Sequence, residues 1–234
     1  MKTYIQKYIA SSGYCSRRQA EALVKSGKVK VNGQEVAMGY LVDSEIDSVC
    51  VKGENIQQSA KKIYIKLNKP KGFVCTTAKF KDEKSVLDLV NLKDRLYPVG
   101  RLDKDSRGLV LLTNDGLVAN KLTHPRYEHE KKYQVKVKEN NIGGLVVENI
   151  IIRMKSGISS EGEVLKAKEV SIISPNTFEL ILAEGKKRQI RRMFKALDLN
   201  VEDLKRTSIS TIQLGNLKEG EWSHLSKEEI EDIL

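Results

Sequence analysis

The sequence predicts an α+β protein with a small helix-rich module over residues 1–60 and a larger domain over residues 61–234. Helical spacing of apolar residues dominates the first 30 positions, whereas apolar alternation typical of strands begins after residue 61. Runs of strands with scattered helices and tight turns favour a mainly antiparallel sheet. The 234 residues are enough for one large and one small domain.

The N-terminal module is predicted to begin with two helices. The apolar residues on one side of the first helix are Tyr4, Ile5, Tyr8 and Ile9. Ser16 and Gln19 form a capping-box pattern that opens the second helix, and Gly27 is predicted to end it. A short apolar alternation leads into Asn32-Gly33, which predicts a tight hairpin. Residues 53–60 are polar and unpatterned, so they are interpreted as a linker.

The larger domain alternates predicted strands with short helices. Apolar patterns predict strands over residues 63–67, 73–77, 109–112, 133–137 and 178–182. Helices are predicted after Ser85, after the Asn114-Asp115-Gly116 turn, over residues 189–197, and after Ser226, where Glu229 completes a capping box. The sheet is therefore expected to form the body of this domain.

The net charge of +10 is unevenly distributed. Basic residues gather in three blocks, 1–32, 61–81 and 186–195, whereas acids outnumber bases over residues 33–60. One such block is typical of a solvated face, but three separated blocks favour an extended polyanion such as nucleic acid. Arg17 and Arg18 fall in the first turn of a predicted helix, where the helix dipole favours acids, and this conflict indicates a functional site.

The composition also indicates the compartment. No apolar run approaches the length of a membrane span, and the N-terminus has no secretion signal. Three cysteines, Cys15, Cys50 and Cys75, have no metal-like spacing and are interpreted as reduced thiols. The sequence therefore predicts a cytoplasmic protein.

The segment GRLDKDSRGLVLLTNDG, residues 100–116, places Asp103 in a basic loop directly before a continuous apolar strand. A carboxylate in such a loop can be a catalytic group, or it can simply be satisfied by turn amides. A magnesium site built from Asp103 and Asp105 is a further alternative. Because Arg101, Lys104 and Arg107 occupy the same loop, the sequence does not favour a cation there.

Three segments, GRLDKDSRGLVLLTNDG, HEKKYQVKV and EGKKRQIRRMF, resemble the motifs of pseudouridine synthases of the RsuA/RluB/RluE/RluF family. The resemblance extends from Thr3 to about Leu225, and DKDS with HEKKY is most similar to the RluF branch. One small departure is Ser106, where many relatives carry threonine. The resemblance implies an isomerase that converts a specific uridine of 23S ribosomal RNA to pseudouridine, without cofactor or metal.

The resemblance also implies roles for five residues. Asp103 would be the nucleophile or base, Tyr133 would pack against the target uracil, and Arg191 would pair with Asp103. Arg192 points about 100° away from its neighbour on a helix, so only one of the two should reach the aspartate. The remaining two residues would hold the substrate: Arg101 would fill the space left by the flipped base, and Leu204 would floor the pocket. Simpler interpretations remain open for three of them: a core aromatic, a phosphate contact and a core leucine.

The segments CSRRQAE and GKVKVNG resemble the S-four-type RNA-binding module over about 50 residues. The residues that would face RNA by this likeness are Ser16, Arg17, Arg18, Lys28 and Asn32. Ribosomal RNA is therefore the expected partner, and the protein is expected to be a monomer. The main alternative is a non-catalytic RNA-binding or ribosome-assembly factor, which would leave the catalytic motifs unexplained.

Overall fold

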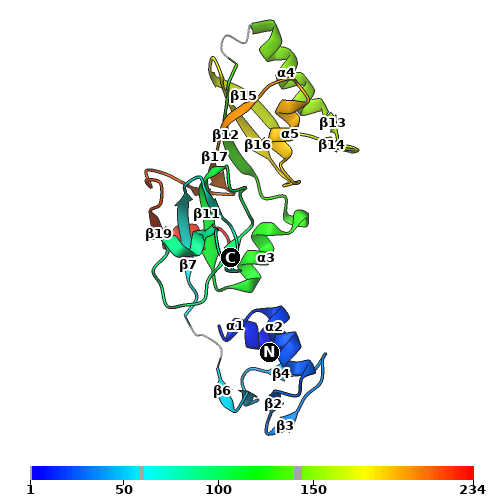
Figure 1. Cartoon of the computed structure of the whole chain (residues 1–234), viewed down its shortest axis with the longest axis vertical. Coiled ribbons are helices and arrows are strands. Elements are labelled where there is room, and N and C mark those ends of the chain that lie inside the picture. Colours follow the sequence, from blue (N-terminus) through cyan, green and yellow to red (C-terminus); the bar gives the residue numbers. More distant parts are fainter. Residues whose placement is uncertain (1, 58–60, 140–143) are drawn as a thin grey trace. The chain divides into compact units, whose positions relative to one another are not determined.

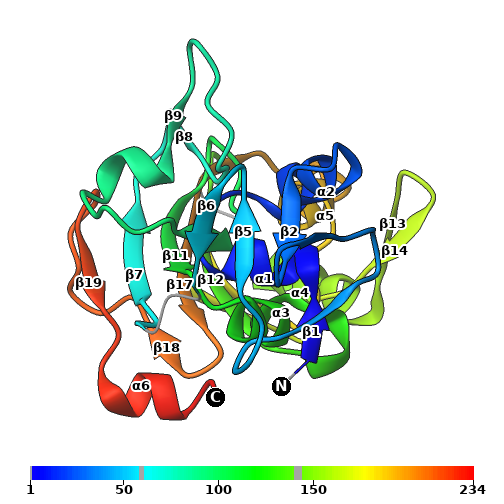
Figure 2. The same cartoon turned by 90° about the horizontal axis from the view of Figure 1, so that it is seen from below.

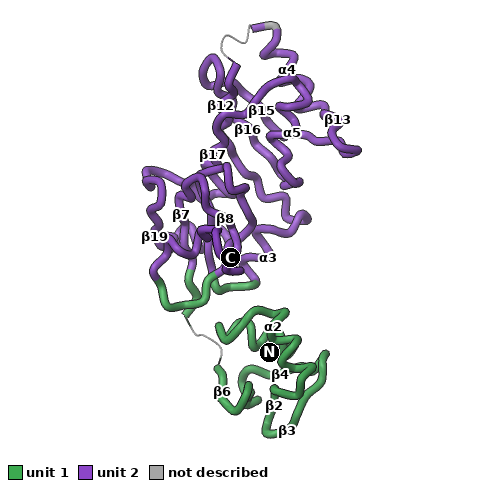
Figure 3. The backbone as a smooth tube through the Cα atoms, viewed as in Figure 1, with its two compact units in different colours: residues 1–63, 92–96, 114–116 green, residues 64–91, 97–113, 117–234 purple. Residues whose placement is uncertain are grey.

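The computed structural model describes residues 2–57, 61–139 and 144–234 (Figure 1). Its chain divides into two compact units, coloured separately in Figure 3. Unit 1 comprises residues 1–63, 92–96 and 114–116, and unit 2 comprises residues 64–91, 97–113 and 117–234.

Unit 1 combines two helices, α1 (Ile5–Ser11) and α2 (Arg17–Lys25), with a four-stranded antiparallel sheet. The strands, in sheet order, are β3 (Gln34–Glu35), β2 (Val29–Val31), β5 (Val49–Val51) and β6 (Glu54–Ile56). The neighbouring strands β2, β5 and β6 are seen side by side in Figure 2. Two further short strands, β1 (Lys2–Tyr4) and β4 (Leu41–Asp43), pair with each other.

The predicted local signals of unit 1 are present. The Gln19 amide donates to Ser16 Oγ at 3.2 Å, and the Ser16 amide donates to Gln19 Oε1 at 3.0 Å, which completes the capping box of α2. Asn32 and Gly33 have φ values of 51° and 81°, as a tight hairpin between β2 and β3 requires.

Two expectations for this unit need correction. Tyr4 was expected on the apolar side of the first helix, but it precedes α1 and is 52% exposed. The predicted linker over residues 53–60 contains strand β6, whose backbone pairs with β5 and whose Ile56 packs against the core of the unit, although Glu54 and Asn55 are polar. Residues 58–60 of that prediction lie outside the described residues.

Unit 2 is built on a nine-stranded sheet. Its main path runs β15-β16-β12-β17-β11-β7-β19, with β10 added to β11 and β18 added to β17. The strands are β7 (Tyr64–Lys69), β10 (Tyr97–Val99), β11 (Arg107–Thr113), β12 (Lys131–Val137), β15 (Glu169–Ser174), β16 (Thr177–Leu182), β17 (Val201–Ile209), β18 (Ile212–Gln213) and β19 (Trp222–His224). The pairings in this sheet are antiparallel except that of β11 with β17, so the predicted α+β class with a mainly antiparallel sheet is confirmed.

Helices and two small strand pairs complete unit 2 (Figure 2). The helices are α3 (Gly116–Thr123), α4 (Gly144–Ser156), α5 (Gln189–Lys195), α6 (Lys227–Glu231) and the 3-10 turns η1 (Val86–Leu89) and η2 (Pro125–Tyr127). The pairs are β8 (Phe73–Val74) with β9 (Lys84–Ser85), and β13 (Ile158–Ser160) with β14 (Glu163–Leu165). The strand expected over 73–77 is thus shorter than predicted. None of the helices in the described ranges is long and apolar enough to cross a membrane.

Gly108 sets how closely the two central strands of this sheet approach. It has a φ of +106°, and a Cβ atom built there would lie 2.3 Å from the backbone oxygen of Arg206. Gly108 and Arg206 are partners in the parallel pairing of β11 with β17. The close approach brings the loop that precedes β11, which carries Asp103, beside the strand that carries Leu204.

Candidate active site

A cavity of about 1020 Å³ lies within unit 2. Its wall is formed by the loop before β11, by β12 and β17, by the start of α5, and by the segment around β8. All five residues predicted to be catalytic or to hold the substrate line this cavity: Arg101, Asp103, Tyr133, Arg191 and Leu204. They come from four separate segments of the chain: the loop before β11, β12, α5 and β17.

The backbone of the Asp103 loop is hydrogen-bonded by a buried lysine. Lys69 is completely buried, and its Nζ donates to the carbonyl oxygens of Ser106 at 2.5 Å, Pro70 at 3.1 Å and Lys104 at 3.4 Å. Burial lowers the pKa of the Lys69 ammonium, while nearby groups that include the Asp103 carboxylate act in the opposite direction. Two of these hydrogen bonds, to Lys104 and Ser106, fix the backbone of the Asp103 loop, and the third holds the turn that follows β7.

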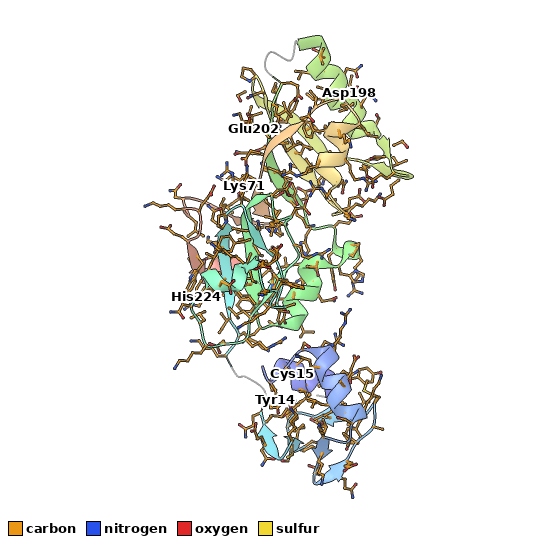
Figure 4. The ribbon with its side chains drawn as sticks, in the orientation of Figure 1. Tyr14, Cys15, Lys71, Asp198, Glu202 and His224 are labelled. Carbon is orange, nitrogen blue, oxygen red and sulfur yellow. The ribbon has the colours of Figure 1, made fainter. Side chains whose placement is uncertain are left out.

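A second anchor comes from the turn after β7. The Gly72 amide donates to the carbonyl of Lys104 at 2.8 Å. The Lys71 side chain, labelled in Figure 4 with Glu202, lies 2.7 Å from Asp203 Oδ1 and donates to the Glu202 carbonyl at 3.4 Å. This turn therefore ties the Asp103 loop to strand β17.

Tyr133 and Leu204 belong both to the core and to the cavity. Tyr133 is 7% exposed and lies on the same face of β12 as the buried residues Val135 and Val137, since the three occupy every second position. Leu204 is 5% exposed, and its backbone is paired with that of Val135. Each side chain contributes part of its surface to the cavity wall, so the simpler core interpretation and the substrate-binding interpretation are compatible.

Arg191 lies in the cavity wall, but it does not pair with Asp103 as predicted. Its Nε lies 3.2 Å from Asp105 Oδ2, and its Nη2 donates to the Asp105 carbonyl at 3.1 Å. The turn over residues 103–106 directs Asp105, rather than Asp103, towards α5. Among the described residues, the Asp103 carboxylate has no ion pair and no side-chain hydrogen bond, and its side chain is half-buried.

Arg192 turns away from the cavity, as the helical geometry predicts for the neighbour of Arg191. Its Nη1 lies 2.7 Å from Glu163 Oε2, and its Nη2 donates to the Ser160 carbonyl. Only the first of the two adjacent arginines therefore faces the Asp103 loop.

Arg188 is a cavity residue that the sequence reasoning did not single out. It precedes α5 with a left-handed φ of +49°, and its Nη2 donates to Asp105 Oδ2 at 3.2 Å. The only sequence signal was its membership of the basic block over residues 186–195. That block could not distinguish a cavity residue from a solvated one.

The predicted RNA-facing residues of unit 1 fall into two groups. Arg17, Arg18 and Lys28 are exposed, and their side chains make no hydrogen bond or ion pair with other described residues. Ser16 Oγ caps α2, whereas the Asn32 Nδ2 donates to Asp47 Oδ1 at 2.8 Å and the Asn32 Oδ1 accepts from the Ser48 amide at 2.9 Å. Ser16 and Asn32 therefore have structural tasks, and their contact with RNA remains a prediction.

The alternative of a magnesium site at Asp103 and Asp105 depends on how many possible ligands lie together. Over the described ranges, no three side chains among His, Cys, Asp and Glu are grouped so that they could hold a metal ion. Asp105 lies instead within 3.2 Å of Arg188 and Arg191, which belong to the α5 segment and not to the basic loop itself.

Comparison with known proteins identifies the kind of enzyme to which this cavity belongs. The model of the family described as RNA pseudouridylate synthase matches residues 63–196, and that of the S4 domain matches residues 5–45. The chain is 37% identical over 231 residues to the dual-specificity RNA pseudouridine synthase RluF of Escherichia coli strain K12, a match that covers 98% of this chain and 77% of the relative. It is 39% identical over 237 residues to ribosomal large subunit pseudouridine synthase B of Bacillus subtilis strain 168, covering 98% of this chain and 94% of the relative.

A solved structure supports the same assignment. A crystal structure of a pseudouridylate synthase matches with a TM-score of 0.71 and 31% identity, and the match covers 99% of each chain. With an S4 domain preceding a catalytic domain that matches over more than half of the chain, this protein belongs to the RNA pseudouridylate synthase family.

Proposed function

We propose that this protein converts a specific uridine of large-subunit (23S) ribosomal RNA to pseudouridine during ribosome biogenesis. Family membership supports the reaction. The substrate is supported by the similarity to a synthase named for the large ribosomal subunit. The observation that carries the proposal is that Asp103, Tyr133 and Arg191, from three separate segments, line one cavity.

The reaction requires a nucleophile or base but no net donor or acceptor. The bond between the ribose and the ring nitrogen breaks, and a ring carbon forms the new bond to the same ribose. That carbon loses its proton and the nitrogen gains one, so the product is an isomer. The Asp103 carboxylate is suited to act as nucleophile or base because its loop is fixed from beneath and its oxygens are not bound to other described side chains.

The other cavity residues would hold the uridine after it leaves its base stack. Tyr133 would pack against the uracil ring, and Leu204 would form the floor below it. Arg101, which is exposed at the cavity wall, would occupy the space left in the RNA. Arg191 would supply positive charge near Asp103 while its guanidinium is held by Asp105.

The two predicted domains would divide the work. Residues 1–60 would bind ribosomal RNA through exposed basic side chains, of which Arg17, Arg18 and Lys28 are the candidates. Residues 61–234 would carry the chemistry. We further propose that the protein acts as a monomer in the cytoplasm.

The test is release of tritium from large-subunit ribosomal RNA labelled at carbon 5 of uracil and extracted from cells that lack this protein. We expect release, and we expect one additional pseudouridine in RNA from cells that contain the protein. A non-catalytic assembly factor would bind the same RNA without releasing tritium.

The same assay tests the expected independence from metal. Because the isomerisation needs no Lewis acid, tritium release should persist in EDTA under conditions in which the RNA remains folded. If chelation abolished release and a divalent ion restored it, with RNA folding unchanged, the metal-free mechanism would be wrong.

A further inference from the structure

Asp105 is shared by two arginines at the first turn of α5. Its Oδ2 accepts a hydrogen bond from Arg188 Nη2 at 3.2 Å and lies 3.2 Å from Arg191 Nε. Arg188 and Arg191 both line the cavity that contains Asp103. One carboxylate therefore determines where two guanidinium groups stand at this wall.

The two arginines depend on Asp105 to different degrees. The Arg191 side chain is 15% exposed and also donates to the carbonyl of Val201 at 3.3 Å and to Ser106 Oγ at 3.4 Å. The Arg188 side chain is 47% exposed, and within the described residues Asp105 is its one hydrogen-bond and ion-pair partner. Loss of the Asp105 carboxylate would therefore release Arg188 and leave Arg191 largely in place.

The pair between Asp105 and Arg188 has little to contribute to folding. Both side chains are about half exposed, 48% and 47%, and ion pairs in that setting contribute little to stability. An arginine is, however, well suited to bind phosphate, because its planar fork donates two parallel hydrogen bonds. Arg188 also belongs to a segment with six basic residues, 186–195, that has no acid to oppose a polyanion.

We propose that Arg188 is an additional RNA-contact residue, which binds a backbone phosphate beside the target nucleotide, and that Asp105 is its positioning residue. This inference rests on the proposed function and deepens it by naming where the RNA backbone crosses the cavity mouth. The left-handed φ of +49° at Arg188 fixes the start of its side chain, and Asp105 fixes its end.

The effect of removing the Asp105 charge has an informative sign. An acid that merely faces RNA repels it, so Asp105→Asn would then strengthen binding and raise kcat/KM. A positioning residue has the opposite effect, because the freed Arg188 side chain must be ordered again when RNA binds. The two roles can therefore be distinguished by the direction of one change.

The experiment uses the full chain and the tritium-release assay on large-subunit ribosomal RNA, with Arg188→Gln, Asp105→Asn and the double variant. We expect Arg188→Gln to lower kcat/KM about tenfold or more, as for a lost hydrogen bond to a charged group. Asp105→Asn should lower it about three- to tenfold, and the double variant should match Arg188→Gln alone, because coupled residues are not additive. The salt dependence of RNA binding should lose about 0.7–0.9 of slope in Arg188→Gln.

Glu163→Gln is the matched control. Glu163 begins strand β14, and its Oε2 lies 2.7 Å from Nη1 of Arg192, which is in α5. The Glu163 side chain is 45% exposed, and neither residue lines the cavity. This variant should leave kcat/KM unchanged. An equal loss in Glu163→Gln would overturn the proposal, because the effect would then come from a loosened α5.

Two other results would also overturn it. One is a higher kcat/KM in Asp105→Asn than in the wild type. The other is a double variant in which Asp105→Asn lowers kcat/KM below that of Arg188→Gln by the same factor as it does in the wild type.

Measurements of RNA binding keep this test separate from the test of the proposed function. If the wild-type chain released no tritium, the proposed function would fail, and an unchanged salt slope in Arg188→Gln would independently remove the phosphate contact.

Discussion

At the residue scale, Asp103 combines a rigid backbone with a side chain that is free to react. The carbonyl groups of Lys104 and Ser106, which follow it, are held by buried Lys69, whereas its own carboxylate binds no other described side chain. We predict that Asp103→Asn abolishes tritium release and leaves RNA affinity nearly unchanged, since asparagine keeps the shape and loses the nucleophile. Filter binding of labelled ribosomal RNA provides the affinity, and measurable turnover in this variant would refute the role of Asp103.

The two adjacent arginines of α5 allow a paired comparison at the same scale. Arg191 reaches the Asp103 loop, whereas Arg192 pairs with Glu163 outside the cavity. Arg191→Ala should therefore lower turnover severely, because it removes the cation beside the loop together with the hydrogen bonds to the Asp105 carbonyl and to Ser106 Oγ. Arg192→Ala should change turnover little, although it breaks an ion pair. Steady-state tritium release measures both, and the reverse order of effects would show that the wrong helix face had been assigned.

At the scale of elements, the close pairing of β11 with β17 depends on one glycine. A methyl group at Gly108 would lie 2.3 Å from the oxygen and 2.6 Å from the nitrogen of Arg206, and neither backbone atom can move without separating the strands. We predict that Gly108→Ala lowers the free energy of unfolding by about 3–5 kcal/mol, which is the range of strongly destabilising substitutions. Denaturant unfolding of the full chain measures this. Gly144→Ala is the control, since a Cβ there meets no atom within 4 Å, and it should be neutral or slightly stabilising.

The same scale shows what the sequence could and could not reveal. Local signals were reliable: the capping boxes at Ser16 and Ser226 were both predicted, since each depends on residues only three positions apart. Helix α4 was not predicted, because exposed Val146 and Ile152 obscure the apolar stripe that buried Ile150 and Met154 would otherwise form.

Strand β17 was missed for a related reason. Its inward positions include the buried polar residues Arg206 and Ser208, so its sequence lacks the apolar alternation of a strand. Five residues that line the cavity, Arg101, Asp103, Tyr133, Arg191 and Leu204, were predicted because the family motifs identify them one by one, whereas Arg188 was not. The ion-pair partner of Arg191 was predicted wrongly. The choice between Asp103 and Asp105 depends on how the loop turns, and that turn is set by Lys69, which is distant in the sequence.

At the scale of the whole molecule, basic charge is present in both compact units. Unit 1 exposes Arg17, Arg18 and Lys28, and unit 2 carries the basic segment over residues 186–195. Each phosphate that a basic side chain neutralises releases condensed counterions, so RNA affinity should fall steeply and linearly on a logarithmic salt scale. The two units should contribute to that slope separately.

We predict that replacing both Arg17 and Arg18 with Ala reduces the slope by about 1.5, as expected for two lost phosphate contacts. The kcat of the double variant at saturating RNA should be retained, because neither residue lines the cavity. RNA binding titrated at several salt concentrations measures the slope. Replacing Lys25 and Lys30 with Ala removes the same charge from the same unit and serves as the control. If that control flattened the slope equally, binding would depend on the total charge of the unit, whereas a larger effect of the arginine pair locates the RNA contact at the first turn of α2.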